Sequence, residues 1–199
     1  MRLFMSQPSP FARKCRIVIR EHGLSGRVEE IAVPAPYGAY TPLTSVNPIG
    51  QVPTLVDEDG VITTDSQLIC AYLDTIGTGP KLIPAEGPDH WRVRRLEVLG
   101  DAIAEVGVKL RMKTLRPVNE QSPTWIENWK ASLIRALDQA EHRAAGDASF
   151  HLGNIAIVSA VNWVNFRYGG WDLGPERPAL ARLVEAFETR PSFLDTQPG

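Results

Sequence analysis

The sequence predicts an α/β domain built on a small, mixed, four-stranded sheet, followed by an all-α helical bundle. Strand-like and helix-like segments alternate as far as residue 76, whereas every strongly patterned segment beyond residue 89 has helical spacing. Between the two lies "GTGPKLIPAEGP", which has too much glycine and proline for either element. We therefore expect a first domain over residues 1–78, a linker over 79–88 and a helical domain over 89–199.

The elements of the first domain follow from local patterns. Strands are expected over residues 2–6, 28–33, 52–57 and 60–63, and helices over 10–22 and 66–76. Asp59-Gly60 is a strong hairpin signal between the last two strands. A proline-rich loop, with prolines at 34, 36, 42 and 48, precedes the third strand. The first crossover should make its strands parallel and the hairpin should be antiparallel, so the sheet is mixed.

The second domain is predicted to contain helices over residues 89–115, 125–145, 154–168 and 178–189, each followed closely by glycine or proline. In the first of them, apolar residues recur at a spacing of three or four, as on one buried helix face: Leu96, Leu99, Ile103, Val106 and Leu110. Stripes of this kind are typical of a core, and nothing in their spacing indicates a cofactor.

Composition limits the possible functions. The 199 residues carry a net charge of −2 and are 43% apolar, so no overall charge favours nucleic acid or an anionic membrane as a partner. The two cysteines suggest a reducing compartment. The chain shows neither a signal peptide nor the roughly 20 apolar residues of a membrane helix. We expect a cytoplasmic protein that binds neither nucleic acid nor membrane.

Charge is distributed unevenly along the chain. Residues 28–80 contain seven acidic residues and no lysine, arginine or histidine, whereas Arg13, Arg16 and Arg20 share one face of the first predicted helix. Such a face can bind phosphate, but we interpret it as a solvated helix surface.

Several kinds of chemistry lack their residue patterns. The four histidines have no ligand spacing with cysteine or carboxylate, so we expect no metal site. No glycine-rich turn follows a strand, and no Gly-x-Ser-x-Gly elbow is present. Neither a bound dinucleotide nor serine hydrolase chemistry is therefore expected, and we expect no permanently bound cofactor.

Three sites in the first domain remain as candidates for ligand binding or catalysis. Ser9-Pro10 starts the first helix, because serine is a good N-cap and proline fits the first helical position. Val52-Pro53 opens the third strand, where we expect a cis peptide bond, and Asp65-Ser66 starts the second helix. Two helix N-termini favour anions, and a strand edge offers backbone N–H and C=O groups. Together they can receive an extended peptide that bears negative groups.

These segments resemble a known family. "SPFARKCRIVIREHGL", "NPIGQVPTLVDEDG" and "TDSQLICAYLD" resemble the thioredoxin-like amino-terminal domain of bacterial glutathione S-transferases, and "LGNIAIVSAVNWVNFRY" and "RPSF" resemble their helical domain. The resemblance covers essentially the whole chain. It implies a glutathione site in the first domain, an electrophile pocket between the domains and usually a homodimer, for which Arg92, Arg94 and Arg95 opposite the acidic first domain give mild support.

The resemblance also implies roles for individual residues. Ser9 matches the catalytic residue that contacts the glutathione sulfur, Val52 the residue whose backbone pairs with the glutathione cysteine, and Pro53 the cis-proline. The predicted glutathione-binding residues are Phe11, Gln51, Val52, Pro53, Asp65 and Ser66, of which the last two match the positions that hold the γ-glutamyl end. The electrophile pocket is expected to draw on residues 103–111.

A serine hydroxyl can supply the free energy that lowering the thiol pKa of glutathione requires. Lowering a thiol pKa from about 8.5 to about 6.5 takes roughly 2.7 kcal/mol. One hydrogen bond to an anion supplies about 1.5–3 kcal/mol, and a helix N-terminus about 0.3–1 kcal/mol more. The hydroxyl of Ser9 can accept a capping hydrogen bond while it donates its proton to sulfur, so we expect both roles.

We therefore expect a glutathione transferase of the detoxification type, with glutathione as co-substrate and a small electrophile as second substrate. The alternative is a non-catalytic glutathione-binding or protein-interaction module with the same fold. Disulfide exchange is disfavoured, because related thiol-disulfide enzymes have cysteine where Ser9 and often Ala12 stand. Cys15 and Cys70 are interpreted as inert buried thiols.

Two positions depart from the family pattern. Relatives commonly bind the glycine carboxylate of glutathione with a basic side chain from the loop after the second strand or near Gln51, and this chain has none there. Relatives also start the core helix of the second domain with a Ser/Thr-x-x-Asp box, whereas this chain has His151-Leu152-Gly153-Asn154.

Overall fold

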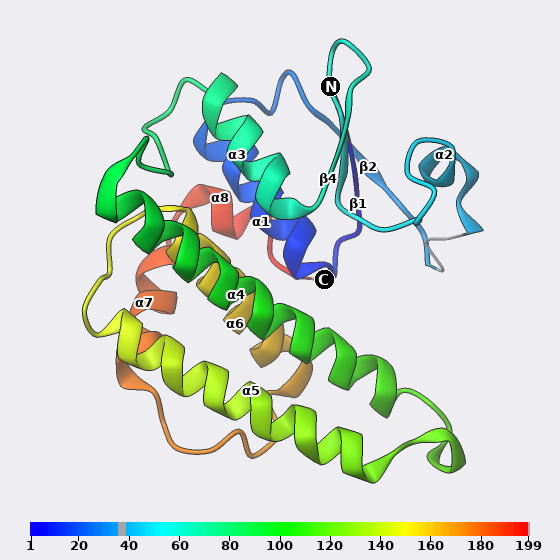
Figure 1. Cartoon of the computed structure of the whole chain (residues 1–199), viewed down its shortest axis with the longest axis vertical. Coiled ribbons are helices and arrows are strands. Elements are labelled where there is room, and N and C mark those ends of the chain that lie inside the picture. The colour runs from blue at the N-terminus through cyan, green and yellow to red at the C-terminus, as the bar shows by residue number, and fades with distance from the viewer. Residues whose placement is uncertain (36–38, 199) are drawn as a thin grey trace. The chain divides into compact units, whose positions relative to one another are not determined.

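The computed structural model describes residues 1–35 and 39–198, so Pro36 of the proline-rich loop lies outside the described residues. The chain divides into two compact units (Figure 1). One contains Met1–His90 together with the residues from Arg190 onward, and the other contains Trp91–Thr189. The first unit thus includes the linker and the C-terminal segment as well as the α/β domain.

The sheet of the first unit has the predicted four strands in the order β2-β1-β3-β4. The strands are β1 Arg2–Met5, β2 Glu29–Ala32, β3 Thr54–Val56 and β4 Ile62–Thr64. β1 and β2 are parallel and the other two pairs are antiparallel, so the predicted mixed sheet is confirmed. β3 starts two residues later than expected, because Pro53 has no N–H to donate to the ladder.

The helices of the first unit are α1 Pro10–Glu21, α2 Thr41–Thr44, α3 Ser66–Ile76 and α8 Pro191–Leu194. α1 and α3 pack against each other (Figure 1) and bury Ile17, Ile69 and Leu73 completely. The bounds of α3 agree with the prediction, whereas α2 and α8 were not predicted. α2 holds Leu43 against a core cluster that contains Phe4 and Val33.

The arginines of α1 do not form the solvated face that we expected. Arg13 and Arg16 are only 2% and 4% exposed. Arg16 Nε donates to Glu30 Oε2 at 2.7 Å, and Arg20 Nη1 donates to Glu30 Oε1 at 2.6 Å. Burial alone would raise the pKa of Glu30, but the hydrogen bonds from Arg20 and Arg16 hold it below its usual value of 4.5. The interpretation was wrong because β2, the strand after α1, places a carboxylate beside this face.

The linker is tied to the first unit through Asp74. The backbone N–H of Leu82 donates to Asp74 Oδ1 at 2.7 Å, and His22 Nε2 lies 2.8 Å from the same oxygen. Thr78 N donates to the carbonyl of His22 at 3.3 Å. A segment rich in glycine and proline is therefore fixed by side chains and backbone groups at the ends of α1 and α3.

The C-terminal segment is held by Glu21 at the end of α1. Arg190 Nη2 donates to Glu21 Oε2 at 2.7 Å, and the Ser192 hydroxyl donates to Glu21 Oε1. Burial would raise the pKa of Glu21, but the hydrogen bonds from Arg190 and Ser192 lower it below 4.5. Phe193 is completely buried, with the guanidinium carbon of Arg13 at 5.4 Å from its ring centre.

The second unit is all helical, as predicted. Its main helices are α4 Gly87–Thr114, which begins in the first unit, α5 Pro123–Ala144, α6 Leu152–Tyr168 and α7 Pro178–Glu188, with a short 3-10 helix at Val118–Glu120. α6 is buried along most of its length. α4 and α6 approach very closely at two glycines. A Cβ on Gly100 would lie 2.5 Å from the backbone of Ala156 and Ile157, and one on Gly153 would lie 2.6 Å from Leu96.

The start of α6 is capped by His151 rather than by a hydroxyl residue. Its Nδ1 accepts the N–H of Asn154 at 3.1 Å, and its Nε2 lies 2.9 Å from Asp147 Oδ2. Asn154 Nδ2 donates to the carbonyls of Asp147 and Ser149. Burial and the nearby Arg92 charge lower the pKa of His151 from 6.5 to about 4. The neutral imidazole of His151 therefore has the capping role that the Ser/Thr-x-x-Asp box has in the relatives.

The lowered pKa of His151 predicts that the protein loses stability in mild acid. Because the pKa of His151 is lowered in the folded protein, the unfolded chain takes up the proton first as pH falls below 6.5. The free energy of unfolding should drop by roughly 2–3 kcal/mol as the pH falls from 6.5 to 4. Urea unfolding at a series of pH values measures this drop. His151→Ser keeps a cap that does not titrate, and parallel pH profiles for the two proteins would refute the prediction.

Among the described residues, none of the helices combines the length and the apolar character that crossing a bilayer requires.

Candidate functional site

Ser9 is the N-cap of α1. Its Oγ accepts the N–H of Ala12 at 3.2 Å, and Pro10 occupies the first helical position. The capping role predicted for Ser9 is therefore confirmed. Because this hydrogen bond uses a lone pair of the oxygen, the hydroxyl proton stays available to an acceptor outside the helix. Ser9 is partly exposed, so such an acceptor can reach it.

The loop between β1 and α1 is fixed on both sides of Ser9. The N–H of Ser9 donates to the carbonyl of Ser6 at 3.1 Å. Gln7 Oε1 accepts from Arg16 Nη1 at 2.8 Å, and Glu30 holds the same guanidinium. The sequence analysis missed this role of Arg16, because neither Gln7 nor Glu30 lies at a helical spacing from it.

The Val52-Pro53 peptide bond is cis, as predicted. The ladder of β3 ends at Thr54, so the backbone of Val52 lies outside it. The preceding segment is held by two buried polar side chains that the sequence analysis did not identify. Thr54 Oγ1 donates to the carbonyl of Gln51 at 2.8 Å, and Asn47 Nδ2 donates to the same carbonyl at 3.1 Å. The exposed side chain of Gln51 is thus carried by a fixed backbone.

Asp65 has an unusual backbone conformation at the start of α3. Its φ of +70° lies in a region that residues with a Cβ rarely adopt, and strained positions of this kind cluster at functional sites. Its Oδ1 accepts the N–H of Gln67 at 2.9 Å, so Asp65 is the N-cap. Ser66 occupies the first position of the helix and is 3% exposed. The hydroxyl of Ser66 is therefore not the group that caps α3.

The strand register brings the predicted residues to one end of the sheet. Thr54 pairs with Phe4 on one side and with Thr64 on the other. Because β3 is antiparallel to both neighbours, β1 leaves the sheet, β3 enters it and β4 leaves it at the same end. The groups at this end are the loop to Ser9 and Phe11, the segment Gln51-Val52-Pro53, and Asp65-Ser66.

The electrostatic character of this end follows from α1 and α3. Both helices begin here, and they are 12 and 11 residues long. Backbone N–H groups that have no partner in the first turn of a helix, together with the helix dipole, favour negatively charged groups. The arrangement therefore suits an extended ligand with an anion near each helix start.

The residues at the start of α3 give a prediction that separates ligand binding from capping. If Ser66 holds the γ-glutamyl end, as the resemblance implies, Ser66→Ala should weaken glutathione binding by roughly tenfold through the loss of a hydrogen bond to a charged group. The free energy of unfolding should change little, since Asp65 supplies the cap. Isothermal calorimetry and urea unfolding measure the two effects. Thr75→Ala, at the exposed end of α3, is the control, and an unchanged affinity in Ser66→Ala would remove this residue from the site.

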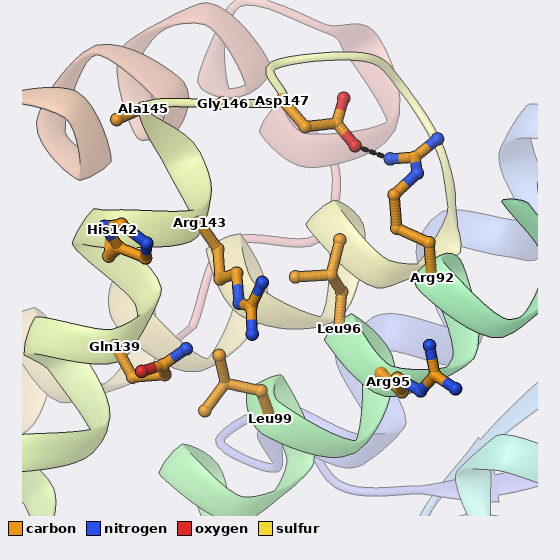
Figure 2. A pocket seen from close by; sticks show the side chains of 10 residues that line it. All are labelled: Arg92, Arg95, Leu96, Leu99, Gln139, His142, Arg143, Ala145, Gly146 and Asp147. Carbon is orange, nitrogen blue, oxygen red and sulfur yellow. Dashed lines mark ion pairs between the residues drawn. The ribbon is translucent and has the colours of Figure 1, made fainter. Parts of the chain in front are cut away.

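A separate pocket lies in the second unit, between α4 and α5 (Figure 2). It has a volume of about 870 Å³, and its lining contains three arginines, Arg92, Arg95 and Arg143. Arg92 is paired with Asp147. None of the predicted glutathione-site residues, and none of residues 103–111, lines it. Within residues 1–35 and 39–198, no three histidine, cysteine or acidic side chains are grouped so as to hold a metal ion.

Comparison with known proteins assigns the family. Residues 8–76 match the family model for the N-terminal domain of glutathione S-transferases. The whole chain is 33% identical to the uncharacterized GST-like protein YibF of Escherichia coli strain K12 and covers 98% of that protein. The chain belongs to the glutathione S-transferase family.

Solved structures of bacterial glutathione transferases have the same fold as this glutathione S-transferase family member. A protein from Methylobacillus flagellatus, solved with glutathione bound, superimposes with a TM-score of 0.92 at 31% identity, covering 100% of this chain and 99% of that one. A family member from Pseudomonas fluorescens Pf-5, solved with S-(propanoic acid)-glutathione, gives a TM-score of 0.86 at 29% identity, with 100% of both chains covered. The thioredoxin-like and helical fold expected from the sequence is thus confirmed.

Proposed function

We propose that this protein binds glutathione and joins its thiolate to small electrophiles, with Ser9 as the residue that stabilises the thiolate. One observation carries the proposal: the register Phe4–Thr54–Thr64 gathers Ser9, Val52-Pro53 and Asp65-Ser66 at one end of the sheet. The solved relatives that contain glutathione and a glutathione conjugate support it.

In the proposed complex, the γ-glutamyl end, the cysteine backbone and the sulfur of glutathione each have a partner. The γ-glutamyl carboxylate accepts hydrogen bonds from the Ser66 hydroxyl and the first turn of α3. The cysteine backbone pairs with Val52, which the β3 ladder leaves outside. Phe11 and Gln51 flank the peptide on either side. The sulfur then lies at the start of α1, next to Ser9.

In the proposed chemistry, a hydrogen bond from Ser9 and the N-terminus of α1 stabilise the thiolate of glutathione. The Ser9 hydroxyl accepts from Ala12 and donates its own proton to the sulfur, which favours the thiolate over the thiol. The thiolate is the nucleophile that forms the new carbon–sulfur bond. An electrophile with a leaving group loses that group, whereas an activated double bond takes up a proton.

The proposal is tested by binding and turnover together. Calorimetry with glutathione measures binding, and a panel that includes 1-chloro-2,4-dinitrobenzene and an unsaturated carbonyl compound measures conjugation. Saturable conjugation with glutathione is the expected result. Binding without turnover across the panel would instead support a non-catalytic glutathione-binding module, and the absence of binding would refute both functions.

We also propose that the protein forms a homodimer, as the resemblance implies. Arg92, Arg94 and Arg95 on α4, and the seven acidic residues over positions 28–80 of the first unit, give this proposal mild support. Static light scattering in low salt measures the mass, and a monomer at micromolar concentration would contradict the proposal.

A further inference from the structure

Two thiols that the sequence treats as separate lie in contact in the structure. Cys15 on α1 and Cys70 on α3 have their Sγ atoms 3.7 Å apart. Both residues are completely buried, and neither forms a disulfide bond in the structure. They are 55 positions apart in the chain, so no local pattern could bring them together. The packing of α1 against α3 does so.

The two sulfur atoms are in van der Waals contact, at 3.7 Å. A disulfide bond is about 2.05 Å long, so the two atoms need to approach each other by about 1.6 Å. That distance can be shared between rotations of two side chains and a small shift of two helices. The side chains come from neighbouring helices and already face each other, which is the arrangement that a bridge between helices requires.

The same pair adjoins the proposed glutathione site. The Cys15 thiol donates to the carbonyl of Ser66 at 3.9 Å. Cys70 lies one helical turn after Ser66 on α3. A change at either sulfur therefore acts directly on the first turn of α3. Oxidation removes the hydrogen that Cys15 donates to Ser66, and bond formation pulls this turn of α3 toward α1.

We propose that Cys15 and Cys70 form a reversible disulfide when a peroxide oxidises them, and that this bond weakens ligand binding at Ser66. The second part rests on the proposed function. One thiol loses its proton, and its sulfur attacks the peroxide to give a sulfenic acid and water. The second sulfur then displaces water from the sulfenic acid. In total two thiols lose two protons and two electrons, and hydrogen peroxide becomes two molecules of water.

Burial sets the rate of this reaction. Thiols react as thiolates and need access to the oxidant, so sulfurs with no exposed surface react only when the helices open locally. We therefore expect oxidation by hydrogen peroxide to be slow, and alkylation of the native protein by iodoacetamide to be slow as well. Once one sulfur is oxidised, the other is its nearest reaction partner.

The first experiment counts thiols in the full chain. Reduced protein is treated with hydrogen peroxide, quenched with catalase, denatured and titrated with a thiol reagent. The expected result is a loss of both thiols, a mass lower by two hydrogen atoms and a peptide linking Cys15 to Cys70, all reversed by dithiothreitol. Cys15→Ala and Cys70→Ala should each retain a thiol under the same treatment. Two titratable thiols in the wild type, or oxygen added to either cysteine without a bridge, would overturn the proposal.

The second experiment measures binding of S-methylglutathione, which has no thiol and cannot reduce the bridge. We expect the oxidised protein to bind it about tenfold more weakly than the reduced protein, as for the loss of one hydrogen bond. Cys15→Ala treated with peroxide is the control and should bind as it did before treatment. Equal affinity of the oxidised and reduced wild type would refute the link to the site. Failure of the reduced protein to bind would refute the proposed function, and the thiol count would still decide whether the disulfide forms.

Discussion

Ser9→Ala is expected to raise the pKa of bound glutathione and to slow its conjugation near neutral pH by roughly 10–100-fold. The reason is the orientation of one hydroxyl, which accepts the N–H of Ala12 at 3.2 Å and keeps its own proton for the sulfur. Affinity for glutathione should change less, because in the proposed complex Val52 and Asp65-Ser66 hold the peptide elsewhere. Ultraviolet absorbance of the thiolate against pH, for glutathione bound to each protein, measures the pKa directly.

The chain contains a matched control for this substitution. Ser122-Pro123 starts α5 with the same pair of residues as Ser9-Pro10 at α1, but it lies in the second unit and the Ser122 side chain makes no capping hydrogen bond. Ser122→Ala should therefore leave the thiol pKa unchanged. Ser9→Ala should also lower stability by about 1 kcal/mol through loss of the cap, whereas Ser9→Thr retains a hydroxyl and should retain much of the activity. Superimposable titration curves for wild type and Ser9→Ala would mean that Ser9 only caps the helix.

Gly100→Ala is expected to destabilise the second unit by about 1–3 kcal/mol, because it overpacks a close contact between helices. The added Cβ would lie 2.5 Å from backbone atoms of Ala156 and Ile157, so α4 and α6 must move apart. Alanine is intrinsically the better helix former by about 1 kcal/mol, so any net loss must come from this contact.

Urea unfolding of Gly100→Ala beside Gly170→Ala tests this explanation. A Cβ on Gly170 would meet nothing within 4 Å, so this control should stay close to the wild type. If Gly100→Ala were as stable as the control, the close approach of α4 and α6 would not contribute to specifying the fold.

The sequence predicted the sheet, the longer helices and the cis bond at Val52-Pro53, because these depend on periodicity and on the special chemistry of proline. It did not predict α2 and α8, because helices of four residues are too short to show a hydrophobic repeat. Nor did it identify His151 as the cap of α6, since histidine is not among the usual N-cap residues.

The errors at the candidate site have a different physical origin. Arg16 was assigned to a solvated face, because a helix pattern does not show which element covers that face. Its partner Glu30 comes from β2. The roles of Asn47 and Thr54 in holding the Gln51 carbonyl, and the contact of Cys15 with Cys70, likewise depend on pairs of side chains from separate segments. Local pattern predicted the residues of the candidate site, and tertiary contacts determine how these residues are held.

The docking of Arg190 and Ser192 on Glu21 has a consequence for the order of events during protein synthesis. The second unit is continuous in sequence, so all of its residues have emerged once Thr189 has left the ribosome. The first unit is not continuous, since Phe193 completes its interior. α1 precedes the second unit in the chain, but Arg190 follows Glu21 by 169 positions, so that part of the α1 surface is covered only after the second unit has been made. The unit that carries Ser9 is thus begun before the second unit and completed after it.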